Sequence, residues 1–167
     1  MTETTEVEDL RNLAERRNSR HDRNFCGVRG ILAPTDLTVE SGKAIAYAVG
    51  LAKTLNAHLT LLHVYKEPHS LEYMRGPDVC AARDRQRQYT ENALELLGKQ
   101  VKGEYADCST EFREGTLCDE LVNAVKELPA DLMVISTRGD KWFRRIAYGC
   151  EAEAIVRLSP CPVLVVR

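Results

Sequence analysis

The sequence predicts an α/β fold in which a parallel, doubly wound sheet is covered by helices on both faces. Two observations lead to that prediction. Apolar, β-rich runs alternate with segments whose apolar residues recur at helical spacing, and the β-rich runs lack the polar alternation of half-exposed strands. Alternating strands and helices require crossover connections, so each helix must cover one face of the sheet. With 167 residues, 44% of them hydrophobic, the chain has the size of one domain.

The first strand and helix are expected between residues 28 and 55. VRGILAP (28–34) is a short apolar run closed by Pro34, and Thr38 is placed to cap the helix that follows. Apolar residues recur at helical spacing in that helix, at Ala44, Ile45, Ala48, Leu51 and Leu55. HLTLLHVY (58–65) then reads as a second strand that is buried on both faces.

The second half of the chain repeats the alternation. Residues 66–78 hold two prolines and a glycine and should form an irregular loop, before a long helix from about Val79 to Val101. The inner face of that helix is expected at Tyr89, Ala93, Leu96 and Leu97. The remaining predicted elements are CSTEFRE (strand), LCDELVNAVKEL (helix), DLMVIST (strand), GCEAEAIVRL (helix) and CPVLVVR (strand).

Residues 1–27 are expected to form a mobile, charged tail ahead of a domain at 28–167. Val7, Leu10 and Leu13 are followed by the polar run ERRNSRHDRN, which cannot bury enough apolar surface to offset the entropy of ordering. An arm that docks on a partner is the alternative.

Composition excludes several function classes. A net charge of −2 with both signs scattered argues against a nucleic-acid binder. No apolar run approaches the roughly 18 residues of a membrane span, and the acidic amino terminus is unlike a signal peptide, so we expect a cytoplasmic protein. The six cysteines form no C-x-x-C pair and offer no zinc spacing, so we expect reduced thiols and no metal site.

Asp36 is the first candidate ligand-binding residue. It follows the first predicted strand in ILAPTD, and doubly wound sheets bind ligands at the strand ends where the strand order reverses. A carboxylate there can accept hydrogen bonds from ribose hydroxyls or an adenine amino group. The alternative is an aspartate that only turns the chain into the next helix.

The stretch STRGDKWFRRIAYGC (136–150) is the second candidate. Gly139 and Gly149 tolerate unusual backbone conformations, and Gly149-Cys150 opens a helix whose free N–H groups favour an anion. Asp140 opposes phosphate binding, and neither a Walker A motif nor G-x-G-x-x-G is present. A plain surface connection is the alternative. The possible phosphate partners are Lys141, Arg144 and Arg145.

Three motifs carry a family resemblance. ILAPTD, LTLLHVY and ADLMVISTRGDKWFRRIAYGCEAEAIVRLSPCPVLVVR, within about residues 28–167, resemble the universal stress protein family in order and separation. The resemblance implies a three-layer α/β sandwich of the adenine nucleotide alpha hydrolase-like type. Its five-stranded parallel sheet has the order 3-2-1-4-5, and a homodimer commonly forms through the last strand, here 161–167.

ATP-binding members carry G-x-x-G, nine residues, then a glycine followed by Ser or Thr. Gly139 and Gly149 keep this spacing, but Ser136 replaces the first glycine and Cys150 the closing hydroxyl residue. At worst, a strained Ser136 and a lost Cys150 hydrogen bond cost about 3–5 kcal/mol, or about two to three and a half decades of affinity. At best the loss is about one decade. The nucleotide-binding residues implied by the resemblance are Pro34, Thr35, Asp36, Val64, Ile135, Ser136, Gly139, Arg145, Gly149, Cys150 and Glu151.

The leading hypothesis is a small cytoplasmic stress-response module that binds an adenine nucleotide, with ATP favoured. Any accompanying Mg²⁺ would be held mainly by phosphate oxygens. No catalytic residue is evident, so at most slow ATP hydrolysis is expected. The alternative is a degenerate, dimeric protein-interaction module that is redox-sensitive at Cys150, whose thiol would open a helix near Arg144 and Arg145.

Overall fold

A computed structural model describes residues 27–67, 76–136 and 151–167. Nearly all of the predicted tail, most of the predicted 66–78 loop and the stretch 137–150 lie outside the described residues. The strands are β1 (Gly30–Pro34), β2 (His58–Tyr65), β3 (Cys108–Glu114), β4 (Leu132–Ser136) and β5 (Val163–Val166). The helices are α2 (Ser41–Leu55), α4 (Pro77–Glu104), α5 (Leu117–Glu127) and α7 (Glu151–Leu158).

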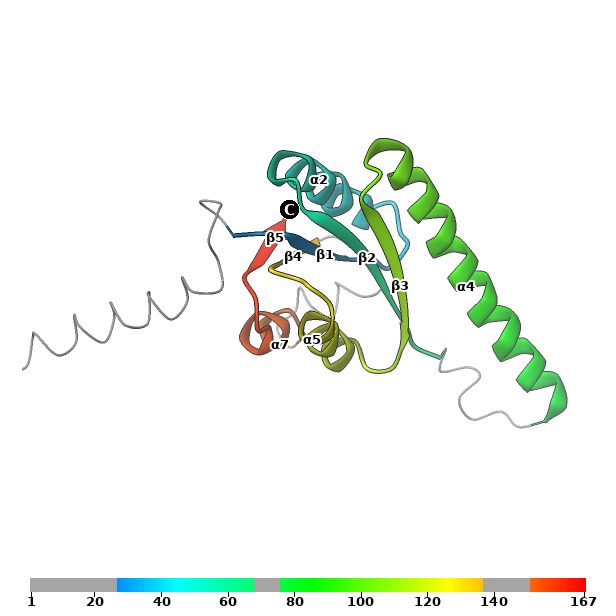
Figure 1. Cartoon of the computed structure of the whole chain (residues 1–167). Helices are drawn as coiled ribbons and strands as arrows, with labels where there is room; N and C mark the ends of the chain where they lie inside the picture. The colour runs from blue at the N-terminus through cyan, green and yellow to red at the C-terminus, as the bar shows by residue number, and fades with distance from the viewer. Residues whose placement is uncertain (1–26, 68–75, 137–150) are drawn as a thin grey trace, which may run out of the picture.

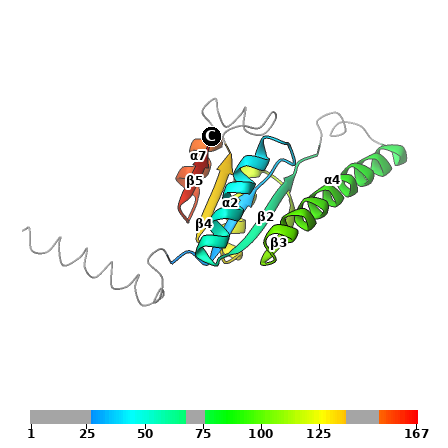
Figure 2. The same cartoon turned by 90° about the horizontal axis from the view of Figure 1, so that it is seen from above.

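The five strands form one parallel sheet in the order β3-β2-β1-β4-β5 (Figure 1). Helices α2 and α4 lie on one side of it, and α5 and α7 lie on the other (Figures 1 and 2). This arrangement confirms the predicted α/β class, the three layers and the strand order. None of the described helices is both long and apolar enough to cross a membrane.

Alternate residues of the inner strands supply two separate hydrophobic cores. Ile31 and Leu61 pack with α2 and α4, whereas Leu32 and Leu62 pack with α5 and α7. Because both side-chain directions end in a core, these strands are mostly apolar on both faces. This double burial explains the uninterrupted apolar runs in the sequence.

Helix α2 begins later than predicted, because Thr38 is not its cap. The helix begins at Ser41, and Glu40 occupies the N-cap position without a side-chain cap bond. The Thr38 hydroxyl instead donates to Asp36 Oδ1 at 2.6 Å, and it accepts only a long 3.4 Å bond from the Ser41 N–H. The Thr38 hydroxyl, which the sequence predicts to cap the helix, is therefore bonded to Asp36 instead.

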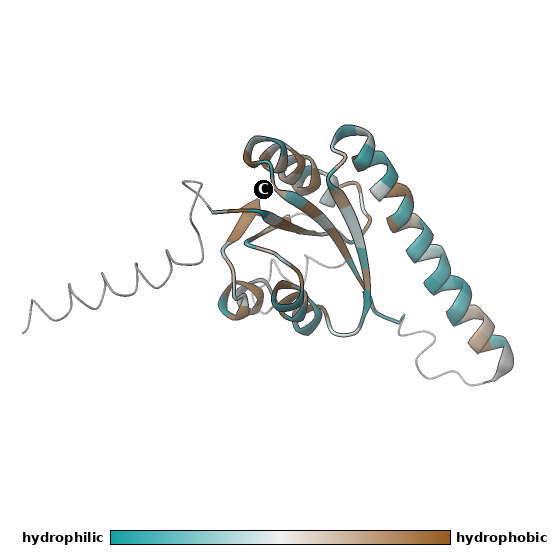
Figure 3. Ribbon diagram, viewed as in Figure 1, coloured by the Kyte–Doolittle hydropathy of each residue, from teal (hydrophilic) through white to brown (hydrophobic). Residues whose placement is uncertain are grey.

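The predicted inner face of α4 is wrong at two positions. Tyr89 is 72% exposed and Leu96 is 61% exposed, whereas Leu94 and Val101 are buried. The helix starts at Pro77 and extends past β3, so its first half has little sheet to cover (Figures 1 and 2). Figure 3 shows that α4 is mostly hydrophilic along its length. At Gly98 an added Cβ would lie 2.4 Å from Thr110 Cγ2 of β3, so the helix packs closely on the sheet there. The side of α4 that faces the sheet therefore contains Leu94, Gly98 and Val101.

Gly30 provides a stability test of the central strand. A Cβ there would lie 1.5 Å from the Pro129 carbonyl oxygen, so Gly30→Ala must displace main chain. We expect it to lower the free energy of unfolding by about 1–3 kcal/mol or more, measured by urea denaturation. The control Gly50→Ala lies on the exposed side of α2 with no atom within 4 Å, and it should raise stability by about 0.5–1 kcal/mol. Equal stability of the Gly30→Ala and native chains would contradict this packing.

Candidate functional site

The carboxyl ends of β1, β2 and β4 meet at one edge of the sheet (Figure 2). The parallel pairing places Pro34 beside Leu62 and Leu32 beside Met133, so the same register brings Ile135 and Ser136 beside the end of β1. Strand order reverses here, because β2 lies on one side of β1 and β4 on the other. The structure thus brings together six of the predicted residues, namely Pro34, Thr35, Asp36, Val64, Ile135 and Ser136.

The other predicted site residues cannot be placed. Gly139, Arg145, Gly149 and Cys150 lie outside the described residues. Glu151 begins α7, but its side chain is not described.

The two carboxylate oxygens of Asp36 differ in their hydrogen bonds to the described residues. Oδ1 accepts hydrogen bonds from the Thr38 N–H at 3.0 Å and the Thr38 hydroxyl at 2.6 Å. Oδ2 is buried and has no hydrogen-bond partner among the described residues. A buried acceptor without a donor costs roughly 1–3 kcal/mol, more for a charged group. The atom is therefore suited to accept a hydrogen bond from a ligand hydroxyl or amino group.

Thr35 fixes the position of Asp36. Its N–H donates to the Leu62 carbonyl at 2.8 Å, and its hydroxyl bonds to Ser41 Oγ at 2.9 Å. The hydroxyl also accepts from the Leu37 N–H at 3.0 Å, which closes a turn in which Leu37 has a left-handed φ of 62°. These polar groups of Thr35 all bond within the chain, so its side chain positions the strand end.

Val64 leaves two main-chain groups at the edge of the site. The Leu62 carbonyl accepts from the Thr35 N–H, so the main-chain groups of Leu62 face β1. In a parallel strand the main-chain groups of every second residue face the same neighbour, so the N–H and carbonyl of Val64 point to the β1 side, beyond the last residue of β1. The Tyr65 carbonyl accepts from the Gly115 N–H on the β3 side, so the two groups of Val64 face the side of β1, which ends at Pro34. The Val64 side chain is buried in the core beneath. Its backbone therefore offers one donor and one acceptor side by side.

Ser136 has an ordinary strand conformation. It is the last residue of β4, pairs with Val166 and is 2% exposed. Positive φ values occur among the described non-glycine residues only at Leu37 and Asn56. The backbone strain that the sequence raised as the worst case for a serine here is therefore absent. Ile135 is equally buried and packs in the core on the α5 and α7 face.

His63 belongs to this strand end and was missed in the sequence. It is 7% exposed, and its Nδ1–H donates to the Thr35 carbonyl at 2.8 Å. Burial lowers the pKa of His63, although the bond to Thr35 and the nearby Asp36 carboxylate act in the opposite direction. The available signal was a histidine inside the apolar run HLTLLHVY. Sequence alone could not show which carbonyl the ring contacts.

A hollow of about 410 Å³ adjoins the ends of β2 and β3. Two of its lining residues are acidic, but Glu67 forms an ion pair with Arg83 and Glu114 with Arg87. The sequence does not indicate this hollow, because its two sides come from the ends of two strands that are far apart in the chain. The lining residues are Tyr65, Lys66, Glu67, Glu114, Gly115 and Thr116.

Burial of His63 predicts an acid-sensitive fold. Its pKa is lower in the folded chain than the value of about 6.5 in the unfolded chain, so the unfolded chain binds more protons as the pH falls through that value. His63→Asn keeps a donor for the Thr35 carbonyl and removes this titration. We expect the free energy of unfolding to fall more for the native chain than for His63→Asn between about pH 7.5 and about pH 5.5. Equal losses in urea denaturation at the two pH values would contradict this role.

Comparisons with known proteins place these features in a family. A sequence model of the universal stress protein family matches residues 27–167. The universal stress protein MJ0531 of Methanocaldococcus jannaschii is 27% identical over 137 residues, covering 82% of this chain and 81% of the relative. The universal stress protein YxiE of Bacillus subtilis is also 27% identical, covering 82% of this chain and 97% of the relative.

Solved structures share the fold. The universal stress protein UspA from Lactobacillus plantarum has a TM-score of 0.66 at 24% identity, over 83% of this chain and 97% of that one. A universal stress protein in complex with cAMP has a TM-score of 0.61 at 23% identity, over 83% and 97%. The Archaeoglobus fulgidus universal stress protein in complex with dAMP has a TM-score of 0.57 at 14% identity, over 84% and 98%. With its parallel sheet in the order 3-2-1-4-5 and a family match from residue 27 to residue 167, this chain belongs to the universal stress protein family.

Proposed function

We propose that this chain binds an adenine nucleotide, ATP above others, at the carboxyl ends of β1, β2 and β4, and acts as a stress-response signalling module. The observation that carries the proposal is the buried Oδ2 of Asp36, which lacks a donor among the described residues. A ribose hydroxyl supplies such a donor. The residues present therefore fit the sugar of a nucleotide.

The Val64 backbone fits the base of the same ligand. Adenine presents an amino donor beside a ring-nitrogen acceptor, and a carbonyl beside an N–H is complementary to that pair. Val64 has both groups directed past the end of β1. The cAMP and dAMP complexes among the structural neighbours support an adenine compound as the ligand class.

ATP is favoured over smaller adenine nucleotides by the phosphate stretch. Gly139 and Gly149 keep the spacing of ATP-binding family members. We propose phosphate contacts from the N–H groups around Gly139, Gly149, Cys150 and Glu151 and from the Arg145 guanidinium, with Mg²⁺ held mainly by phosphate oxygens. Since Ser136 is unstrained, the remaining cost is the hydroxyl lost at Cys150, about 1.5–3 kcal/mol or one to two decades in affinity.

Asp36→Asn tests the ribose contact. Asparagine keeps an acceptor for Thr38 and replaces the Oδ2 acceptor by an NH₂ donor, so the loop is preserved while the ligand contact is lost. We expect ATP to bind the native chain and to bind the variant about 10- to 150-fold more weakly, measured by calorimetry with and without Mg²⁺.

Two further variants of the chain serve as controls for the ATP titration. Asp119→Asn, an exposed aspartate in the first turn of α5, should bind ATP as the native chain does. The double variant Ser136→Gly with Cys150→Ser restores the family motif. If the native chain is silent and the double variant binds, those two residues disable the pocket and the proposal for the native chain fails. If Asp36→Asn binds ATP as tightly as the native chain does, the proposed contact between Asp36 and the ribose is wrong.

We also propose that β5 forms a homodimer contact. It is an edge strand of the sheet, and Val165 on it is 41% exposed. An apolar edge strand pairs readily with a second copy, and a charge on the edge opposes such pairing.

Val165→Glu should therefore give a monomer or insoluble protein in light scattering. The control Leu96→Glu changes an apolar side chain that is 61% exposed on α4, which packs at the opposite edge of the sheet, and it should leave the dimer intact. An unchanged soluble dimer in Val165→Glu would exclude this role for β5.

A further inference from the structure

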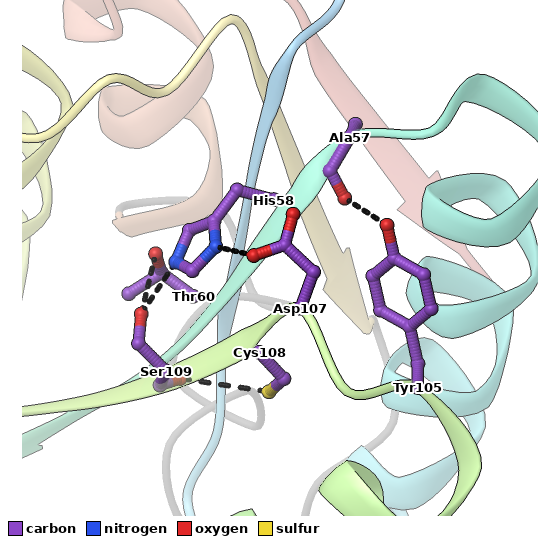
Figure 4. Close-up of polar contacts among 7 residues, drawn as sticks. All are labelled: Ala57, His58, Thr60, Tyr105, Asp107, Cys108 and Ser109. Carbon is purple, nitrogen blue, oxygen red and sulfur yellow. Dashed lines mark hydrogen bonds and ion pairs between the residues drawn. The ribbon is translucent and has the colours of Figure 1, made fainter.

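Four polar side chains form a continuous hydrogen-bonded series at the amino ends of β2 and β3 (Figure 4). Asp107 Oδ1 lies 2.6 Å from His58 Nδ1, and His58 Nε2 lies 2.7 Å from Ser109 Oγ. Thr60 Oγ1 lies 3.3 Å from the same Ser109 oxygen. Val64 is six residues from His58 along β2, about 20 Å at the rise of a strand, so this cluster is separate from the proposed nucleotide site.

The parallel register of the two strands holds the cluster in place. Leu59 pairs with Cys108 and Thr60 with Ser109, so residues 58, 60, 107 and 109 share one face of the sheet. Main-chain bonds fix both sides of the contact, because the Leu59 N–H donates to the Asp107 carbonyl at 3.0 Å and the His58 N–H to the Arg29 carbonyl at 2.7 Å. The side chains therefore start from a rigid backbone.

The distances fit an arrangement of protons that leaves Nε2 of His58 as an acceptor. If Asp107 is ionised and His58 is neutral, the imidazole donates through Nδ1–H to Asp107 and accepts through Nε2. The Ser109 hydroxyl then donates to Nε2, and its oxygen is left to accept from the Thr60 hydroxyl. This is the order of atoms in a Ser-His-Asp triad, in which the histidine removes the serine proton and the carboxylate orients the histidine.

We propose that Ser109 is a nucleophile that takes an acyl group from a small activated carboxylic ester. As Oγ bonds to the carbonyl carbon, His58 Nε2 takes the hydroxyl proton. The carbon–oxygen bond to the leaving alkoxide or phenolate breaks, and His58 returns the proton to the leaving group or to solvent. Asp107 is a positioning residue. The His58 side chain is 36% exposed and that of Asp107 59% exposed, so a small donor can reach the cluster.

The reactivity can be tested on the full chain with p-nitrophenyl acetate. We expect one acetyl group on Ser109, located by peptide mass spectrometry, and none there in Ser109→Ala. His58→Gln should lower the rate of Ser109 acetylation by about 100-fold or more, the usual contribution of a general base. Asp107→Asn should lower it by about tenfold or more, because it favours the wrong imidazole tautomer. The control Ser159→Ala removes a hydroxyl that bonds to Cys161 instead, and it should leave the Ser109 rate unchanged.

The outcomes separate a reactive site from a purely structural network. A structural network would shift the thermal unfolding midpoint in the variants without any Ser109-specific acetylation in the native chain. An unmodified native Ser109, under conditions that acetylate exposed groups such as Cys80, would overturn the proposal. So would native-rate acetylation of Ser109 in a folded His58→Gln chain. If His58→Gln does not fold, the same comparison in Asp107→Asn decides.

Discussion

The burial of β1 on both faces is the constraint on which the rest of the structure depends. All five residues from Gly30 to Pro34 are buried, and the strand pairs with β2 on one edge and β4 on the other. The Asp131 carboxylate accepts from the N–H groups of Arg29 and Gly30 and so links the start of β1 to the segment before β4. A strand without a free face or edge has one possible register, so the chain leaves the sheet at a fixed point.

That fixed point determines the geometry of the strand-end site. Thr35 bonds to β2 through its main chain and to the start of α2 through its hydroxyl, and His63 holds its carbonyl. Asp36 follows directly, in a turn closed by Leu37 and Thr38. Asp36 Oδ2, which lacks a donor among the described residues, is thus held in place by the neighbouring strands and helix.

Much of the fold could be predicted from the sequence, because burial on two faces leaves a direct mark on composition. The strands, their order and the place of Asp36 follow from the apolar runs and the family motifs. The face of α4 could not be predicted, because Tyr89 and Leu96 fit helical spacing as well as the buried Leu94 and Val101 do, and the sequence does not show which side of the helix meets the sheet. The contacts of His63, and the meeting of His58 with Ser109, depend on strand register and ring orientation, which no local pattern contains.

The proposed ligand contact at Asp36 Oδ2 would also couple ligand binding to the stability of the fold. A molecule that donates to Oδ2 binds only the folded chain, since the unfolded chain lets water solvate the carboxylate. Each increase in the concentration of that molecule then lowers the unfolded population, and with it the fraction open to proteolysis. The abundance of the protein would follow the supply of its ligand without any change in its synthesis.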